Sequence, residues 1–433
     1  MNSLQEVLAK HKWSLLILFS FLLELGFHTF FRKLFGVYFS PLTISFLGLI
    51  LIWAAHKNFQ NRQALQITST GRTGFFYLLF FVALSGVFFI LFSKSIKNFP
   101  IDAAFSDVVP TLKYYCTRLL HGEYVYAPIN YSTWTVIPNY LTFQWLPFVV
   151  AEFFHFDYRF IALIAYYLVL LVWVFYLVKN SKETPAVLVL KILLPFIFLY
   201  SFYDRVPSVY GFSVELLIAS YYLFLAFGLI RKHTLVLILA LGLCLFSRFS
   251  LLFWLPVLAM FLYLHYSFKY FLRLFFGVFL VGFFSYVLPF MTQDPWVFFK
   301  GMQYYGDAAI GEWVLKAYQN TGDYPDHLGK GIGYAVYFYD FYPGSLEEKL
   351  LACRMTHLIL SLLIGLALCI VFYWKKGVWK SPFYLLLALK LYFIIFYSFI
   401  HVPYIYLQLV PLSISLAIVL NSQLFKGVEL NKY

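Results

Sequence analysis

Repeated apolar runs of about 20 residues constrain this chain most, because a helix of that length crosses the hydrocarbon core of a membrane. Such a helix also satisfies its backbone polar groups internally. Of the 433 residues, 62% are hydrophobic and 12% charged, which excludes an ordinary soluble protein. The sequence therefore predicts an all-α, polytopic transmembrane helical bundle that forms one domain over residues 1–433. A β-barrel would instead show short alternating segments.

The apolar pattern predicts about twelve membrane spans. They cover residues 13–31, 37–55, 74–93, 159–178, 185–203, 212–230, 234–247, 250–267, 271–291, 351–374, 382–400 and 403–421. The apolar stretch 141–154 is short for a crossing and contains Pro147 and Glu152. We therefore expect this stretch to be re-entrant or interfacial rather than spanning.

Positive charge in the short loops predicts the orientation. Lysine and arginine pairs such as Arg231-Lys232 and Lys375-Lys376 fall in alternate short connections, which are typical of the cytoplasmic side. This cytoplasmic excess accounts for most of the formal net charge of +13. The expected location is a bacterial inner (plasma) membrane, with both long loops on the extracytoplasmic side. Lys390, in the inner half of its span, is expected to snorkel toward the cytoplasm, as is Lys191.

The two long extracytoplasmic loops, residues 94–158 and 292–350, are the candidates for a site in water. The second loop contains eight acidic residues, four lysines and many glycines and tyrosines. That composition is typical of a loop able to cover a site. Four widely spaced cysteines give no metal-ligand spacing and no disulfide framework, so neither is expected.

The first long loop carries two carboxylates close to the end of a predicted span, Asp102 and Asp107. From Asp107 to His121 the apolar residues fall on one helical face, which predicts an amphipathic helix in the outer membrane interface. Ser106 or Asp107 would cap this helix. Asp107 is then either a plain cap or a general base at a helix N-terminus, and the two roles are compatible. Asp102 is either a solvated loop residue or a second candidate base.

Candidate substrate-binding residues also fall on the extracytoplasmic side. They are Arg118, Arg159, Arg205, Arg248, His401 and Tyr404. Arg248 lies between two predicted spans, where an isolated guanidinium is costly. It could bind a lipid phosphate through parallel hydrogen bonds, or it could pair with a local acid such as Asp204 or Glu215. His401 and Tyr404 are either structural or in contact with a sugar or phosphate.

These segments resemble the GT-C superfamily of integral-membrane glycosyltransferases, most closely family 87 and its mannosyltransferase-like relatives. The resemblance rests on Ser106-Asp107, on the turn from Leu119 through Gly122 to Tyr126, and on the Pro-bearing return over 131–147. His401-Val-Pro-Tyr404 before the last span is similar as well. The acidic loop follows the third span here rather than the first, which implies two additional N-terminal helices.

The resemblance implies inverting transfer of a sugar, mannose above other hexoses or pentoses, from a polyprenyl-phosphate donor to a glycan or glycolipid acceptor. Asp107, or else Asp102, would be the general base. Arg205 and Arg248 would face the lipid phosphate, and Tyr126 would belong to the substrate site. The bilayer is the remaining partner, and no cofactor, metal or nucleic acid is expected.

Two other functions remain alternatives. A flippase or transporter of lipid-linked sugars should carry charged residues deep in several spans. An O-antigen polymerase or ligase type of enzyme should centre its chemistry on basic residues in the late loop. The predicted charges lie at the outer rim, and the late loop is acidic, so both alternatives fit less well than a glycosyltransferase.

Overall fold

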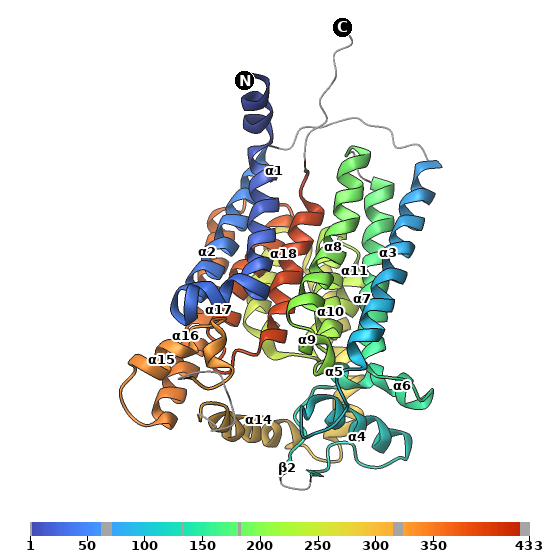
Figure 1. Ribbon diagram of the computed structural model, residues 1–433, viewed down its shortest axis with the longest axis vertical. Coiled ribbons are helices and arrows are strands. Elements are labelled where there is room, and N and C mark those ends of the chain that lie inside the picture. The colour runs from blue at the N-terminus through green and yellow to red at the C-terminus, as the bar shows by residue number, and fades with distance from the viewer. Residues whose placement is uncertain (1, 62–71, 132–133, 181–182, 315–323, 425–433) are drawn as a thin grey trace.

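The chain forms a bundle of long helices with shorter helices gathered at one end, as seen in a computed structural model (Figure 1). The structure describes residues 2–61, 72–131, 134–180, 183–314 and 324–424. Within them, strands are limited to one antiparallel pair, β1 (Ile129–Asn130) and β2 (Thr135–Val136).

The bundle contains α1 (Asn2–Gly26), α2 (Arg32–Gln60), α3 (Arg72–Ile96), α7 (Arg159–Asn180), α8 (Pro185–Arg205), α10 (Glu215–Arg231), α11 (Thr234–Leu245), α12 (Leu255–His265), α13 (Phe268–Gly282), α16 (Leu346–Trp374), α17 (Phe383–Ser398) and α18 (Leu409–Asn421). The π-helical turns η1 (Phe27–Phe31) and η4 (Phe283–Met291) extend α1 and α13. The 3₁₀ segments η3 (Phe249–Trp254) and η7 (Ile405–Gln408) lead into α12 and α18.

Each range predicted to span a membrane coincides with a helical segment. By length and composition, six segments among the described residues could cross a membrane. They are 11–60, 74–96, 159–179, 185–205, 268–291 and 346–374. Four apolar helices are shorter: Thr234–Leu245, Phe249–His265, Phe383–Ser398 and Ile405–Asn421. The helical class is therefore confirmed, and the number of twelve spans stays a prediction.

The first of these segments is a hairpin rather than one straight helix. Its backbone leaves helical geometry at Gly36, where φ is +72°, a value that favours glycine. Trp13 of α1 and Trp53 of α2 then meet with ring centroids 4.8 Å apart. The two helices therefore run side by side in opposite directions (Figure 1).

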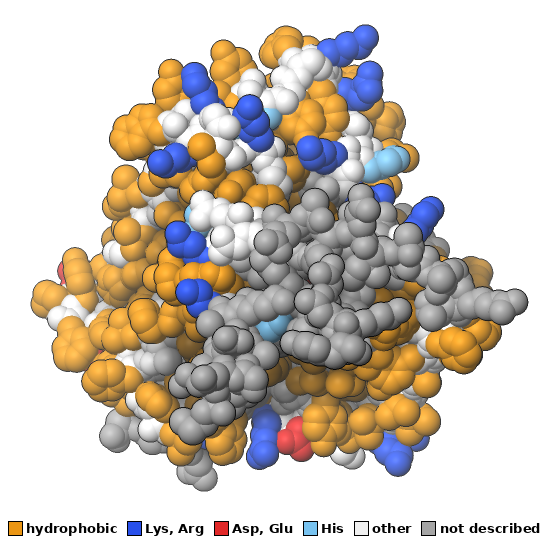
Figure 2. Space-filling view, turned by 90° about the horizontal axis from the view of Figure 1, so that it is seen from above, with side chains coloured by type: hydrophobic (Ala, Val, Ile, Leu, Met, Phe, Trp, Pro, Cys, Tyr) orange, Lys and Arg blue, Asp and Glu red, His pale blue; other side chains and the backbone are white. Residues whose placement is uncertain are grey.

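One end of the bundle is rich in basic side chains. The beginning of α1 and the end of α18 lie at this end, opposite α4 and α14 (Figure 1). Figure 2 looks onto this face and shows Lys and Arg around its edge. The exposed cations at these helix ends include Lys12, Lys179, Arg231, Lys232, Lys269, Arg273, Lys375, Lys376 and Lys380. The cations used for the orientation thus lie at one end of the bundle, and both the orientation and the identity of the membrane stay predictions.

The opposite end is built from the two long loops. The first supplies α4 (Val108–Leu120), α5 (Thr142–Trp145), η2 (Leu146–Phe148) and α6 (Val149–Phe153). The second supplies α14 (Val297–Ala308), η5 (Ala309–Glu312), η6 (Leu328–Lys330) and α15 (Ala335–Phe341), and its residues 315–323 lie outside the described part. The stretch 141–154 thus folds as short pieces around Pro147, each too short to cross a membrane.

The predicted behaviour of Lys390 is wrong. Its ammonium group does not reach the cytoplasmic end but forms an ion pair with Glu24 of α1, and both side chains are buried. The second oxygen of Glu24 accepts a hydrogen bond from Ser415 of α18 at 2.7 Å. Lys191 differs, because it reaches Glu183 at 2.7 Å and the Leu420 carbonyl at 2.8 Å, both at the basic end of the bundle.

Candidate functional site

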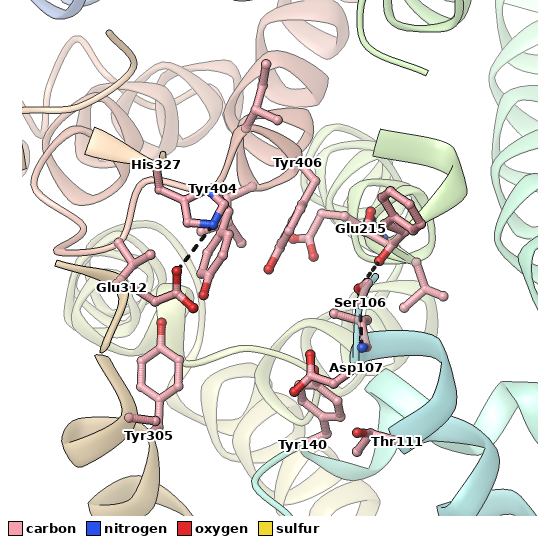
Figure 3. A pocket seen from close by; sticks show the side chains of 18 of the residues that line it. Ser106, Asp107, Thr111, Tyr140, Glu215, Tyr305, Glu312, His327, Tyr404 and Tyr406 are labelled. Atoms are coloured by element: carbon pink, nitrogen blue, oxygen red, sulfur yellow. Dashed lines mark hydrogen bonds and ion pairs between the residues drawn. The ribbon is translucent and has the colours of Figure 1, made fainter. Parts of the chain in front are cut away.

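A cavity of about 580 Å³ lies where the two long loops meet the helical bundle. The first loop lines it through residues 105–111 and 136–144, and the second through 304–312 and 326–330. The bundle contributes α9 (Ser208–Gly211), the start of α10, Arg248 and residues 402–407. Figure 3 shows side chains from these segments converging on the cavity.

Asp107 lines this cavity at the start of α4. It occupies the N-cap position, but its carboxylate makes no capping hydrogen bond. The cap bond comes instead from Ser106, whose Oγ accepts from the Val108 amide at 3.4 Å. Burial raises the pKa of Asp107, and a hydrogen bond to its own backbone partly offsets this rise. Asp107 is therefore a carboxyl group without a side-chain partner among the described residues, and its oxygens can accept a proton from a group in the cavity.

Asp102 lies away from the cavity. It is exposed, and its Oδ1 accepts a hydrogen bond from the Ala104 amide at 2.9 Å. This geometry is that of an Asx turn in a solvated loop. Of the two candidate bases, the structure brings only Asp107 into the cavity lining.

Arg248 also lines the cavity, and it forms an ion pair with Glu215. Of the two acids considered as its local partner, the structure thus selects Glu215. Glu215 begins α10, where the helix dipole stabilises a negative charge, and its side chain is only 2% exposed. Glu215 Oε1 and Arg248 Nε are both buried without a hydrogen-bond partner among the described residues.

The opposite wall of the cavity is formed by the second long loop. Figure 3 shows Glu312 and His327 across the cavity from Asp107. His327 Nε2 lies 3.5 Å from a Glu312 oxygen, and its Nδ1 lies 3.3 Å from Lys330 Nζ. Lys330 in turn pairs with Asp326 at 2.6 Å. This wall therefore presents alternating acidic and basic groups.

Tyrosine side chains occupy much of the remaining lining. Tyr404 stacks on Tyr406 with centroids 5.1 Å apart, and it also contacts the His327 ring at 4.3 Å. Tyr140 and Tyr305 line the cavity from the first and second loops. Burial raises the pKa of both Tyr140 and Tyr305, so their hydroxyls keep their protons and can donate hydrogen bonds.

His401 lies just behind this lining. Its ring is 5.6 Å from the Tyr305 ring, and its backbone carbonyl accepts a hydrogen bond from the Trp313 indole at 2.8 Å. Burial and the nearby charge of Arg354 lower the pKa of His401 to about 3. The imidazole is therefore neutral in the physiological range, which does not suit it to bind a phosphate by charge.

Two other predicted substrate residues make contacts within the first loop. Arg118 donates to the carbonyls of Val125 at 3.3 Å, of Pro128 at 2.9 Å and of Ala127. Tyr126 is buried, donates to the Tyr140 carbonyl at 3.0 Å and accepts from Trp145. Neither residue lines the cavity.

Arg159 and Arg205 also lie outside the lining. Arg159 is buried, pairs with Asp157, and donates to the carbonyls of Phe99 at 2.8 Å and Gly211 at 2.9 Å. Arg205 is exposed and pairs with Asp204 at 2.7 Å. The structure thus brings Asp107, Arg248 and Tyr404 together and leaves the other six predicted site residues apart.

Sequence reasoning did not single out Glu312, His327, Asp326 and Lys330 as site residues. The acidic character of the late loop was the available signal, but only the folded positions of both loops around the cavity place these groups opposite Asp107. Among the described residues, no group of three or more His, Cys, Asp or Glu side chains is arranged to hold a metal ion.

The chain was also compared with known proteins. No family model, curated protein or solved structure matches it.

Proposed function

We propose that the chain is a multi-pass membrane glycosyltransferase of GT-C type, with twelve spans and a site on the extracytoplasmic side. It would transfer a sugar, mannose first, from a polyprenyl-phosphate donor to a glycan or glycolipid acceptor. The observation that carries the proposal is the position of Asp107. This carboxyl group was predicted as the base from the sequence, and it lines a cavity built from both long loops without a side-chain partner among the described residues.

In the proposed reaction, Asp107 accepts the proton of an acceptor hydroxyl while the hydroxyl oxygen attacks C1 of the sugar. The bond from C1 to the phosphate oxygen breaks, and the lipid phosphate leaves with the electron pair. Inversion requires that the base and the leaving group stand on opposite sides of C1. His327 lies on the wall opposite Asp107 (Figure 3), and Lys330 Nζ lies 3.3 Å from its Nδ1. We assign the phosphate to these two basic groups.

This assignment replaces the phosphate role first expected for Arg205 and Arg248. Arg205 lies outside the cavity lining, and Glu215 already offsets the charge of Arg248. Both walls pair their basic groups with carboxylates, Arg248 with Glu215 and His327 and Lys330 with Glu312 and Asp326. We place the phosphate on the second of these walls because it faces Asp107, as inversion requires.

A transfer assay with purified protein tests the proposal. Wild type, Asp107→Asn and the matched Asp102→Asn variant would each receive radiolabelled polyprenyl-phosphate mannose, glucose or arabinose, with membrane extract as acceptor. We expect transfer by wild type and by Asp102→Asn, and a loss of about 10²- to 10⁴-fold in Asp107→Asn. Transfer that survives in Asp107→Asn but not in Asp102→Asn would move the role of base to Asp102. If no donor supported transfer, the proposal that the chain is a glycosyltransferase would be refuted.

A flippase is the second candidate, and one observation favours it. The Glu24–Lys390 pair lies among the helices, where a transporter is expected to carry charge. The assay for this function uses vesicles that contain the protein and a fluorescent lipid-linked sugar. Protein-dependent movement of the lipid between leaflets, without any transfer, would favour the flippase.

A further inference from the structure

The helix α14 begins close to the end of a segment that is long and apolar enough to cross a membrane, residues 268–291. Two backbone hydrogen bonds tighten the turn that joins them. The Asp294 amide donates to the Phe290 carbonyl at 3.3 Å, and the Val297 amide donates to the Asp294 carbonyl at 3.2 Å. α14 therefore starts near the level at which this spanning segment ends.

The other end of α14 is joined to a second such segment, residues 346–374. Arg354 of α16 donates a hydrogen bond to the Gly306 carbonyl. Leu351 and Met355, which precede and follow Arg354 on α16, are 58% and 47% exposed. Exposed apolar side chains on a spanning helix face lipid. α14 thus runs across the direction of the long helices, at the level of side chains that face lipid (Figure 1).

One face of α14 points into the molecule. Val297 and Gly301 are buried, and a Cβ atom at Gly301 would lie 3.0 Å from the Cα atom of Asn139 in the first loop. Tyr304 and Tyr305 line the cavity, and Figure 3 shows Tyr305 pointing into it. This side of α14 is therefore a wall of the cavity.

A second face of α14 is apolar and does not line the cavity. Phe298 contacts Phe249 at the beginning of η3, with ring centroids 5.3 Å apart, which directs this face toward the helical bundle. Phe299 and Met302 on the same side are 57% and 51% exposed. Trp296, just before the helix, is also exposed, and tryptophan favours the membrane interface. The exposed apolar surface of the bundle thus continues onto α14.

The third face of α14 is polar. Lys300, Gln303 and Asp307 follow one another at helical spacing and are all exposed. Lys300 also pairs with Asp294 at 2.7 Å. A helix with one exposed apolar face and one exposed polar face is typical of a helix that lies in the plane of a membrane interface.

We propose that α14 lies in the membrane leaflet at this end of the bundle, with Phe299 and Met302 inserted among the lipid chains and its polar face toward water. The same helix carries Tyr304 and Tyr305 at the cavity, so one helix separates the cavity from lipid. This inference concerns the membrane contact of α14 and does not depend on the proposed transfer reaction.

Nitroxide labels test the contact. The native cysteines are buried, so a thiol-directed label reacts with an introduced cysteine, and unsubstituted protein reports any background. Phe299→Cys, Met302→Cys and the matched control Gln303→Cys would be labelled in the full chain and placed in phosphatidylcholine nanodiscs. Electron paramagnetic resonance then compares collisions with oxygen, which concentrates in lipid, and with a nickel chelate, which stays in water.

We expect the ratio of oxygen to nickel collisions at positions 299 and 302 to exceed that at 303 at least about threefold, because the apolar face of an interfacial helix lies below the headgroups. Equal ratios at the three positions overturn the proposal. Few collisions with either reagent at 299 and 302 would show that protein, such as a second copy of the chain, covers this face, and would overturn the proposal as well.

Hydrogen exchange provides a measurement without labels. In nanodiscs, the amides of α14 should exchange at least about tenfold faster in Phe299→Ser/Met302→Ser than in wild type, because burial of even one large apolar side chain contributes that much. Gln303→Ser is the matched control and should exchange as wild type does. Exchange in the buried helix α10 should stay unchanged in both variants, which excludes general loss of folding. Unchanged exchange of α14 in the double variant overturns the proposal.

Discussion

Glu24 and Lys390 form an ion pair between α1 and α17 in which the side chains are 2% and 1% exposed. Lys390 also donates to the Pro411 carbonyl at 3.3 Å, and Ser415 donates to the other Glu24 oxygen. The pair therefore joins the N-terminal hairpin to the last two helices. Each charged side chain can be buried there because the opposite charge of its partner offsets the cost of removing it from water.

Replacement of one partner should destabilise the bundle more than replacement of both. Lys390→Met leaves Glu24 charged, buried and unpaired, which costs about 3–5 kcal/mol. The double variant Glu24→Gln/Lys390→Met removes both charges and should recover most of that loss. Thermal unfolding temperatures in detergent compare the stabilities of these variants. Lys380→Met, which replaces an exposed lysine, is the control and should match wild type. A double variant as unstable as Lys390→Met would contradict this prediction.

Asp107→Asn should stabilise the protein at neutral pH while it abolishes transfer. Burial raises the pKa of Asp107, so between its unfolded and folded pKa values the native state binds more protons than the unfolded state. Stability therefore falls as pH rises through that window, and an ionised Asp107 at neutral pH opposes folding. Asparagine carries no such cost. Equal unfolding temperatures of wild type and Asp107→Asn at neutral pH would argue against the predicted burial of charge.

The pH dependence of transfer should show an acid limb set by Asp107. A base must be ionised, so kcat/KM falls as the pH drops through the raised pKa of Asp107, above the ordinary value of 3.8. His401, with a pKa of about 3, stays neutral over this range, so His401→Gln should leave the limb in place. Initial rates across pH for wild type, His401→Gln and Asp107→Asn test this. If the residual activity of Asp107→Asn still falls at low pH in the same way, the acid limb belongs to another group. His327 would be the first such group to test.

Arg118 should act as a clamp on the first loop rather than as a substrate ligand. Its guanidinium reaches three carbonyls between Val125 and Pro128, and a lysine ammonium cannot span the same set. Arg118→Lys should therefore speed limited proteolysis within 121–131 while the binding of methyl mannoside changes little. Unchanged proteolysis with weakened sugar binding would restore the substrate role.

The sequence was sufficient to predict the helical class and the positions of the helical segments, because apolar length and turn residues are local signals. It also placed Asp102 and Asp107 just before an amphipathic helix, and of these two only Asp107 lines the cavity; its role as a base stays a prediction. It left the partner of Arg248 open between Asp204 and Glu215, since the choice depends on how α10 packs beside η3. Lys390 was misplaced for the same reason, because its partner Glu24 belongs to a helix distant in the chain.

The second long loop was the least predictable part. Its composition suggested a cover for a site, but no periodic pattern places Glu312 or His327 opposite Asp107. Their positions depend on how α14 and η6 pack against other parts of the molecule. Such long-range contacts leave no local trace in a single sequence.

The cavity draws its walls from residues between Phe105 and Leu407, and this span has a consequence for biosynthesis. Asp107 leaves the ribosome in the first third of translation, but Tyr404 and Tyr406 follow only near its end. A nascent chain already inserted in the membrane therefore exposes Asp107 long before the groups opposite it exist. The cavity is therefore completed only when the segment that precedes the last helix has been synthesised, so any ligand that needs both walls has to wait for nearly the whole chain.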